Sequence, residues 1–86
     1  MTLTADTRAR IESILSSHDV VLFMKGSPQR PQCGFSMKAS SIVSGIIPEY
    51  AHVDVLQDPE IREGIKEFGQ WPTIPQLYVK GELIGG

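Results

Sequence analysis

The sequence predicts an α/β domain in which a mixed β-sheet is flanked by helices. Residues 20–25, VVLFMK, form a continuous β-branched and aromatic run of strand length, as is typical of a strand buried on both faces. Apolar residues recur at helical spacing before and after this run, which indicates helices that cover a sheet. The closing stretch, PQLYVKGELIGG, contains two short strand patterns around Lys80 and Gly81, which predicts a hairpin.

Two helices are predicted around the central strand. In the first, Asp6 is the expected N-cap, the helix is expected to end near His18, and the apolar stripe consists of Ala9, Ile11, Ile14 and Leu15. The second follows the glycine- and proline-rich segment GSPQRPQ and extends up to Pro48, with a stripe of Phe35, Ala39, Ile42, Val43 and Ile46. Cys33 is therefore expected where a loop enters a helix.

A second strand and a third helix follow. Residues 50–55, YAHVDV, alternate between polar and apolar side chains, which predicts a strand parallel to the first one. Asp58 as N-cap and Pro59 at the first position open the third helix, whose end is expected to place Gly69 in a left-handed conformation. The order helix, strand, helix, strand, helix and hairpin predicts a thioredoxin-like fold with a four-stranded mixed sheet.

Length and composition are those of one small globular domain, and we expect residues 1–86 to form it. Apolar residues make up 41% and charged residues 21%, and the formal charge of −2 offers no basic surface for nucleic acid. The apolar runs are too short to cross a membrane, and the first residues are unlike a targeting segment, so we expect a cytoplasmic protein. With one cysteine, the chain closes no disulfide within itself.

Cys33 is the predicted reactive residue. A thiol at a helix N-terminus meets unpaired N–H groups and the positive end of the helix dipole, and both favour the thiolate. Lys25, at the end of the central strand, is expected at the same edge of the sheet, to lower the thiol pKa or to hold a carboxylate. The alternative, a small buried apolar cysteine, is disfavoured by the flanking Pro31 and Gly34. Ser36 stands where a dithiol site would carry its second cysteine.

Three segments together resemble the monothiol glutaredoxins of the CGFS class: KGSPQRPQCGFS, WPTIPQLYV and GELIGG. The tetrapeptide CGFS alone has little specificity, but its combination with the preceding KGxPxxPxC spacing and the later WPT-x-PQ is highly specific. The resemblance covers nearly the whole chain. It implies a thioredoxin-like (glutaredoxin) fold, in agreement with the element order predicted above.

The resemblance also implies a glutathione site. Cys33 is similar to the family's active thiolate, and Lys25 and Arg62 to the residues that reach a carboxylate of bound glutathione. Without the resemblance, the two cations would be taken as solvated surface charges. Phe35 is expected either in a helix interface or at the rim of this site, and Gly86 is expected to contact the ligand.

The resemblance further implies a cis peptide bond between Ile74 and Pro75. The N–H and C=O of Ile74 would then pair with the cysteinyl backbone of glutathione, and Thr73 would flank this contact. The alternative is a trans proline that opens an edge strand. Trp71 is compatible with the core, with a cap over glutathione or with a partner surface.

Two functions use a single thiolate. In the first, Cys33 and one glutathione from each of two subunits supply the four thiolates of a 2Fe–2S cluster, so that the chain is a labile cluster carrier in iron homeostasis. The resemblance implies a cluster-bound homodimer, an apo monomer, and BolA-type and apo iron–sulfur proteins as partners. The alternative is an enzyme of weak activity, in which glutathione resolves mixed disulfides by thiol–disulfide exchange. His18 and His52 lack metal-site spacing to Cys33. We expect the carrier.

The end of the sequence departs from the family pattern. After GELIGG, the family continues with a Cys-Asp pair that clamps the γ-glutamyl end of glutathione, and then with a helix that covers the sheet. If the polypeptide ends at Gly86, we expect an incomplete clamp and exposed apolar sheet surface. A terminal Gly-Gly is also typical of ubiquitin-like modifiers, but those begin with a β-hairpin, whereas a helix is predicted first here.

Overall fold

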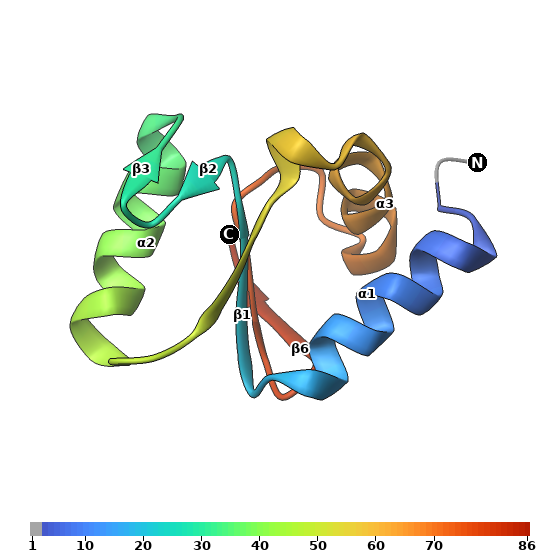
Figure 1. Cartoon of the computed structure of the whole chain (residues 1–86), viewed down its shortest axis with the longest axis horizontal. Helices are drawn as coiled ribbons and strands as arrows, with labels where there is room; N and C mark the ends of the chain where they lie inside the picture. The colour runs from blue at the N-terminus through green and yellow to red at the C-terminus, as the bar shows by residue number, and fades with distance from the viewer. Residues whose placement is uncertain (1–2) are drawn as a thin grey trace.

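The computed structural model describes residues 3–86 and arranges them as a mixed sheet between helices. The elements, in chain order, are α1 (Ala5–Ser17), β1 (Val20–Met24), β2 (Gly26–Ser27), β3 (Arg30–Pro31), α2 (Gly34–Ile46), β4 (Ala51–Asp54), the 3-10 helix η1 (Val55–Gln57), α3 (Pro59–Gly69), β5 (Gln76–Val79) and β6 (Glu82–Gly85). Figure 1 shows α2 on one side of the sheet and α1 and α3 on the other. This arrangement confirms the predicted fold. Among residues 3–86, no helix is long and apolar enough to span a membrane.

The predicted central strand, β1, is central in the sheet. The strand order is β4-β1-β5-β6, with β1 parallel to β4 and antiparallel to β5. All but the first residue of β1 are buried, as its unbroken apolar sequence requires. The β5–β6 hairpin turns at Lys80 and Gly81, whose φ angles of 51° and 81° suit a two-residue turn with the twist of the strands.

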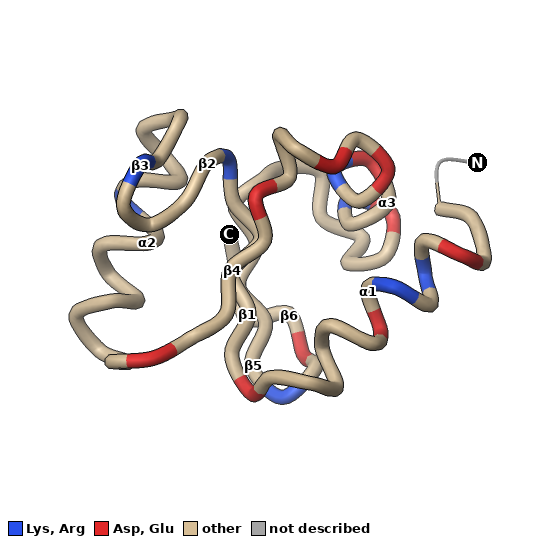
Figure 2. The backbone as a smooth tube through the Cα atoms, in the orientation of Figure 1, with Lys and Arg blue, Asp and Glu red and all other residues tan. Residues whose placement is uncertain are grey.

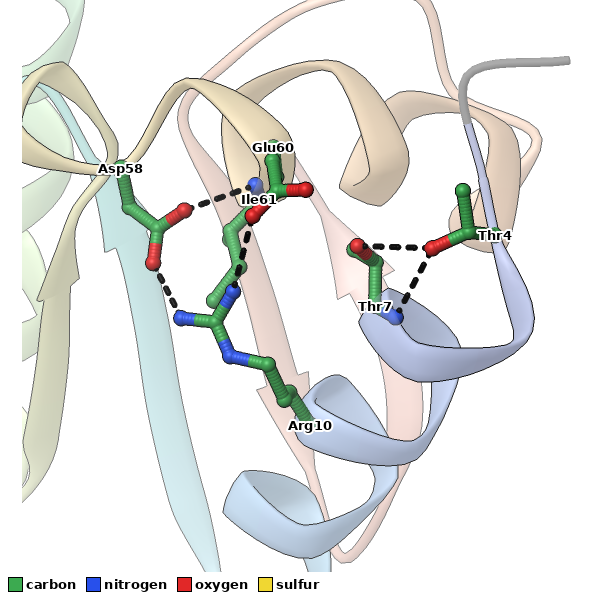
Figure 3. Close-up of polar contacts among 6 residues, drawn as sticks. All are labelled: Thr4, Thr7, Arg10, Asp58, Glu60 and Ile61. Carbon is green, nitrogen blue, oxygen red and sulfur yellow. Dashed lines mark hydrogen bonds and ion pairs between the residues drawn. The ribbon is translucent and has the colours of Figure 1, made fainter.

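The N-terminus of α1 differs from the prediction. Thr4, rather than Asp6, is the N-cap, and its hydroxyl accepts a hydrogen bond from the Thr7 N–H at 3.1 Å (Figure 3). Both side chains are of the type that caps helices, and local sequence does not distinguish them. Asp6 lies in the first turn instead, where a carboxylate interacts favourably with the helix dipole.

The start of α3 agrees with the prediction and is tied to α1. The Asp58 carboxylate accepts a hydrogen bond from the Ile61 N–H at 3.2 Å, and Pro59 occupies the first turn. Arg10 of α1 forms an ion pair with the same carboxylate and lies 3.7 Å from Glu60 (Figure 3). The cap and the ion pair together fix where α3 begins relative to α1.

The end of α3 corrects the second capping prediction. Gln70, with φ 51° and ψ 44°, holds the left-handed position, whereas Gly69 is the last helical residue. A Cβ atom at Gly69 would collide with the Tyr78 hydroxyl and lie 2.9 Å from Gln76 Oε1. Glycine is therefore required at position 69 because β5 approaches closely, and not because of its own backbone angles.

The two faces of the sheet are filled differently. The face under α1 and α3 carries the main core, which includes Ile11, Leu15, Val21, Phe23, Val55, Ile61, Ile65, Ile74 and Tyr78. On the other face, α2 buries Ser36, Ser40 and Val43, while Ile42 and Ile46 of its predicted stripe are exposed. An apolar groove runs beside α2, lined in part by Leu22, Phe35, Ala39, Ile42, Leu77 and Ile84.

Candidate functional site

Cys33 is the N-cap residue of α2, as predicted. Its extended backbone, with φ −154° and ψ 156°, directs the sulfur at the first turn of the helix, where Sγ accepts a hydrogen bond from the Ser36 N–H at 3.3 Å. The Ser36 hydroxyl oxygen also lies 3.3 Å from Sγ, so that it becomes a donor once the thiol ionises. The cysteine is partly exposed, and therefore accessible to a second sulfur atom.

The surroundings of Cys33 favour its thiolate. Burial opposes the charge, but hydrogen bonds from the side chain and backbone of Ser36, a further bond from the Phe35 N–H and the charge of Lys25 outweigh it, so the pKa of the Cys33 thiol is lowered. A lowered pKa raises the fraction of nucleophilic, metal-binding thiolate at neutral pH. This finding argues against an inert buried cysteine.

Ser36 also connects the active-site helix to the end of β1. It is fully buried, and its Oγ accepts a hydrogen bond from the Lys25 N–H at 3.0 Å. The Lys25 carbonyl in turn accepts from the Gln32 N–H at 2.8 Å. The backbone on either side of Cys33 is thereby held against the segment that carries the lysine.

Asp54 is a site-supporting residue that the sequence did not reveal. Its Oδ1 accepts hydrogen bonds from the Gly26 N–H at 2.9 Å and from the Leu56 N–H at 3.0 Å. Gly26 has a φ of 90°, and a Cβ atom there would lie 2.8 Å from the Gln32 nitrogen. A glycine and an aspartate far apart in the chain thus shape the turn after Lys25.

A pocket of about 480 Å³ opens between the end of β1, α3 and the loop before β5, and all seven residues predicted to contact glutathione line it. They are Lys25, Phe35, Arg62, Thr73, Ile74, Pro75 and Gly86. Phe35, with 79% of its surface exposed, forms the rim and lies outside any helix interface. Their contacts to a ligand stay predictions, but their convergence on one pocket is a finding.

The pocket is cationic. Lys66, which was not predicted, lines it together with Lys25 and Arg62, and no carboxylate side chain is among its lining residues. The spacing of four between Arg62 and Lys66 places both on one face of α3, a signal that could have identified the second cation. Figure 2 shows basic positions both in α3 and between β1 and β2.

Within the described chain, Arg62 Nε is the one buried side-chain nitrogen or oxygen without a hydrogen-bond partner. Lys66, by contrast, contacts both carboxylate oxygens of Glu63 at 3.2 Å. A buried donor without a partner is costly unless a ligand or water satisfies it. Arg62 thus brings a donor without a partner to the wall of the pocket.

The loop between α3 and β5 forms the opposite wall. The Ile74–Pro75 bond is cis, as predicted. Trp71 is 40% exposed, which excludes the deep core among its three predicted settings. Gly86 packs so tightly against the Trp71 indole and the Pro75 carbonyl that a Cβ atom would collide with both.

Metal ligands of the protein itself are few. Among residues 3–86, no group of three or more His, Cys, Asp or Glu side chains is positioned to hold a metal ion. His18 lines a separate hollow with Asp19 and Glu49, and His52 is exposed on β4. Cys33, the single cysteine of the chain, is not among the residues that line the pocket, but its sulfur accepts a hydrogen bond from the N–H of Phe35, which does line it.

Comparison with known proteins decides the family. The family model "Glutaredoxin" matches residues 20–84. Monothiol glutaredoxin-5, mitochondrial, of Saccharomyces cerevisiae is 53% identical over the whole of this chain, and monothiol glutaredoxin-S17 of Arabidopsis thaliana is 50% identical over 96% of it. The chain belongs to the monothiol glutaredoxins.

Structural similarity gives the same assignment. The solution structure of reduced poplar apo GrxS14 superposes on this glutaredoxin with a TM-score of 0.81 at 42% identity, and the alignment covers all of this chain and 79% of the poplar chain. The glutaredoxin spans 59% of the yeast relative and 17% of the Arabidopsis relative. The solitary Cys33 agrees with the monothiol class.

Proposed function

We propose that this glutaredoxin binds glutathione in the cationic pocket and, as a pair of subunits, carries a labile 2Fe–2S cluster between proteins. The observation that carries the proposal is the pocket itself, which is lined by Lys25, Arg62 and Lys66 and by no carboxylate side chain. Lys25 and Phe35, which also line it, both favour the thiolate of the neighbouring Cys33. Glutathione has two carboxylates and one thiol, and therefore complements both features. The partnerless Arg62 Nε supplies a donor that such a ligand would satisfy.

The number of thiolates that each subunit provides supports a 2Fe–2S cluster as the cargo. A 2Fe–2S cluster is held by about four thiolates, and each subunit contributes Cys33 alone, so two subunits leave half of the ligands to exogenous thiols. Glutathione bound beside Cys33 in each subunit would complete the set. Because half of the ligands would be exchangeable small molecules, release to an acceptor protein would be easy, which suits a carrier in cluster transfer and iron homeostasis.

A second function, glutathione-dependent thiol–disulfide exchange, is favoured by the lowered pKa of Cys33. The Cys33 thiolate would attack the glutathione sulfur of a protein–glutathione disulfide, forming a Cys33–glutathione disulfide and releasing the protein thiolate, which takes up a proton. The thiolate of a second glutathione would then attack this disulfide, releasing oxidised glutathione and restoring the Cys33 thiolate. Ser36, a hydroxyl, is unable to resolve the disulfide in its place.

Anaerobic reconstitution with iron, sulfide and glutathione tests the carrier proposal. We expect a coloured dimer by absorption spectroscopy and size exclusion, with none formed when glutathione is omitted. Cys33→Ser should abolish both colour and dimer, and Ser40→Ala serves as control because Ser40 is buried in the same helix away from the pocket. A cluster retained by Cys33→Ser would refute the proposal. A colourless wild-type monomer that reduces glutathione mixed disulfides would favour the exchange enzyme.

The dimeric state, BolA-type partners and the cytoplasmic location belong to this proposal as predictions. The dimer follows from the ligand count. The partners rest on the family resemblance, and the location is the expectation stated in the sequence analysis.

A further inference from the structure

Gln76, the first residue of β5, is a fully buried polar side chain, and its hydrogen bonds point toward the pocket wall. Its Nε2 donates to the carbonyl of Trp71 at 3.0 Å and to the carbonyl of Thr73 at 3.2 Å. Its Oε1 accepts from the Tyr78 hydroxyl at 2.9 Å. Both N–H donors and one acceptor site of the amide are therefore used, which is the condition for burying such a group without a large penalty.

The two donated bonds hold a single segment, residues 71–75. This segment forms neither helix nor strand, and Thr73, Ile74 and Pro75 in it line the glutathione pocket. At its start, the Trp71 N–H donates to the Lys66 carbonyl at 3.0 Å. Beyond that point, Gln76 provides the side-chain hydrogen bonds that connect the segment to the sheet.

The orientation of the Gln76 amide is fixed from the other side. Tyr78 is buried, burial raises its pKa to about 12, and it therefore remains a hydroxyl donor at neutral pH. A hydroxyl that donates to Oε1 leaves Nε2 for the two loop carbonyls, so the amide has one satisfied orientation. The space that the amide occupies beside Gly69 is available because residue 69 has no side chain, since a Cβ atom there would lie 2.9 Å from Oε1.

We infer that Gln76 is a positioning residue for glutathione, because its amide holds the Trp71 and Thr73 carbonyls toward the core and thereby keeps the wall formed by residues 73–75 in its binding shape. The inference rests on the proposed glutathione site and adds a residue that does not itself line the pocket. Leucine would fill the space but donate no hydrogen bond. Glutamate, when ionised, would oppose two carbonyl oxygens with a negative charge.

The test compares Gln76→Met with Tyr78→Phe in the full chain. Gln76→Met keeps the side-chain length but removes both loop bonds, and we expect glutathione affinity by calorimetry to fall about tenfold, the effect of losing roughly one net hydrogen bond. Tyr78→Phe removes a bond to the same amide but leaves both loop bonds, so its affinity should stay within about twofold of wild type. Both variants should unfold at lower urea concentration than wild type.

A direct readout of the loop separates this inference from the proposed function. Without ligand, backbone amide exchange at Trp71, whose N–H is bonded to the Lys66 carbonyl, should be faster in Gln76→Met than in wild type and in Tyr78→Phe. Unchanged exchange and unchanged affinity would overturn the positioning role. If wild type itself binds no glutathione, the proposed function fails, and the exchange data alone decide whether Gln76 orders the loop.

A protein that tolerates no change at position 76 can still be tested. Should Gln76→Met fail to fold, the wild-type protein itself provides the test. In the wild-type protein, the Gln76 side-chain amide protons should exchange slowly with solvent because both are bonded and buried. Rapid exchange of these protons would contradict the inference.

Discussion

At the scale of single residues, Ser36 takes the place of a second thiol and uses its hydroxyl twice. The oxygen accepts a bond from the Lys25 N–H at 3.0 Å, and the hydrogen is available to the Cys33 sulfur at 3.3 Å. A cysteine at this position would resolve a mixed disulfide of Cys33. The serine instead stabilises the Cys33 thiolate and leaves a mixed disulfide unresolved. The Ser36 hydroxyl thus links the ionisation state of the Cys33 thiol to the position of the segment that carries Lys25.

Ser36→Ala should move the onset of Cys33 alkylation to higher pH. Folded Cys33 has a lowered pKa, partly because the Ser36 hydroxyl bonds to the thiolate, so losing this donor raises the pKa and reduces the thiolate present at a given pH. The measurement is the rate of iodoacetamide reaction against pH. Ser40→Ala, which removes a buried hydroxyl bonded to the Met37 carbonyl, is the matched control and should leave the profile in place. Coincident profiles for Ser36→Ala and wild type would exclude this role.

At the scale of elements, the clearest sequence predictions are those carried by local patterns. The burial of β1, the hairpin turn at Lys80 and Gly81 and the start of α3 follow from contiguous residues, and the structure confirms them. The predicted N-cap of α1 was wrong because Thr4 and Asp6 are both of the type that caps helices, and the local sequence does not distinguish them. The left-handed conformation predicted for Gly69 was wrong because the glycine is required by the approach of the Tyr78 hydroxyl, a tertiary contact that a helix-ending pattern does not report.

Gly69→Ala should destabilise the protein by about 1–3 kcal/mol, because the new methyl group would meet the Tyr78 hydroxyl at the end of α3. Gly45→Ala provides the opposite case, since Gly45 lies in α2 with no neighbour within 4 Å of an added Cβ. That substitution should stabilise the protein by about 0.5–1 kcal/mol through helix propensity. Urea unfolding of both variants gives the comparison, and equal effects would refute the crowding at Gly69.

Asp58→Asn should make the free energy of unfolding less dependent on pH in the acid range. Arg10 and the helix-start N–H groups hold the pKa of the Asp58 carboxyl below its ordinary value, so its stabilisation is present above that value and is lost as pH falls through the folded pKa. Asparagine keeps the capping oxygen but has no charge, whereas Asp58→Ala should lose the cap as well, about 1 kcal/mol. Unfolding free energies from neutral pH down to about pH 3 check this. The gap between Asp58→Asn and wild type should narrow toward the acid end, as the Asp58 carboxyl takes up a proton.

At the scale of the whole molecule, charge is distributed unevenly. The chain has a formal charge of −2, yet the pocket beside Cys33 is lined by three cations and no carboxylate. The site residues come from the end of β1, from α2, from α3 and from the segment before β5. Motif resemblance predicted most of them, whereas Lys66, Asp54 and Gln76 were identified in the folded arrangement, because a motif does not show which pocket contacts and hydrogen bonds its side chains form.

Glutathione affinity should therefore fall as salt concentration rises, since the attraction between its carboxylates and partly exposed cations is screened. Calorimetric titrations between about 0.01 and 0.5 M sodium chloride measure this effect, which the Debye length of ~30 Å at the low end makes large. Glutathione monoethyl ester, which lacks the glycine carboxylate, is the matched ligand and should bind more weakly with a smaller salt dependence. Equal affinities of the two ligands would show that the pocket does not recognise that carboxylate.

The central position of β1 also has a consequence for how the protein is made. Val20 pairs with Val79, so β1 obtains one of its two neighbours from the hairpin that follows residue 75. On the ribosome, β1, α2 and β4 emerge before β5 exists, and the apolar strand meanwhile has one edge without a partner. Open edges of such strands readily pair with other chains. The nascent chain is therefore most prone to aggregation in the interval that ends when β5 joins the sheet.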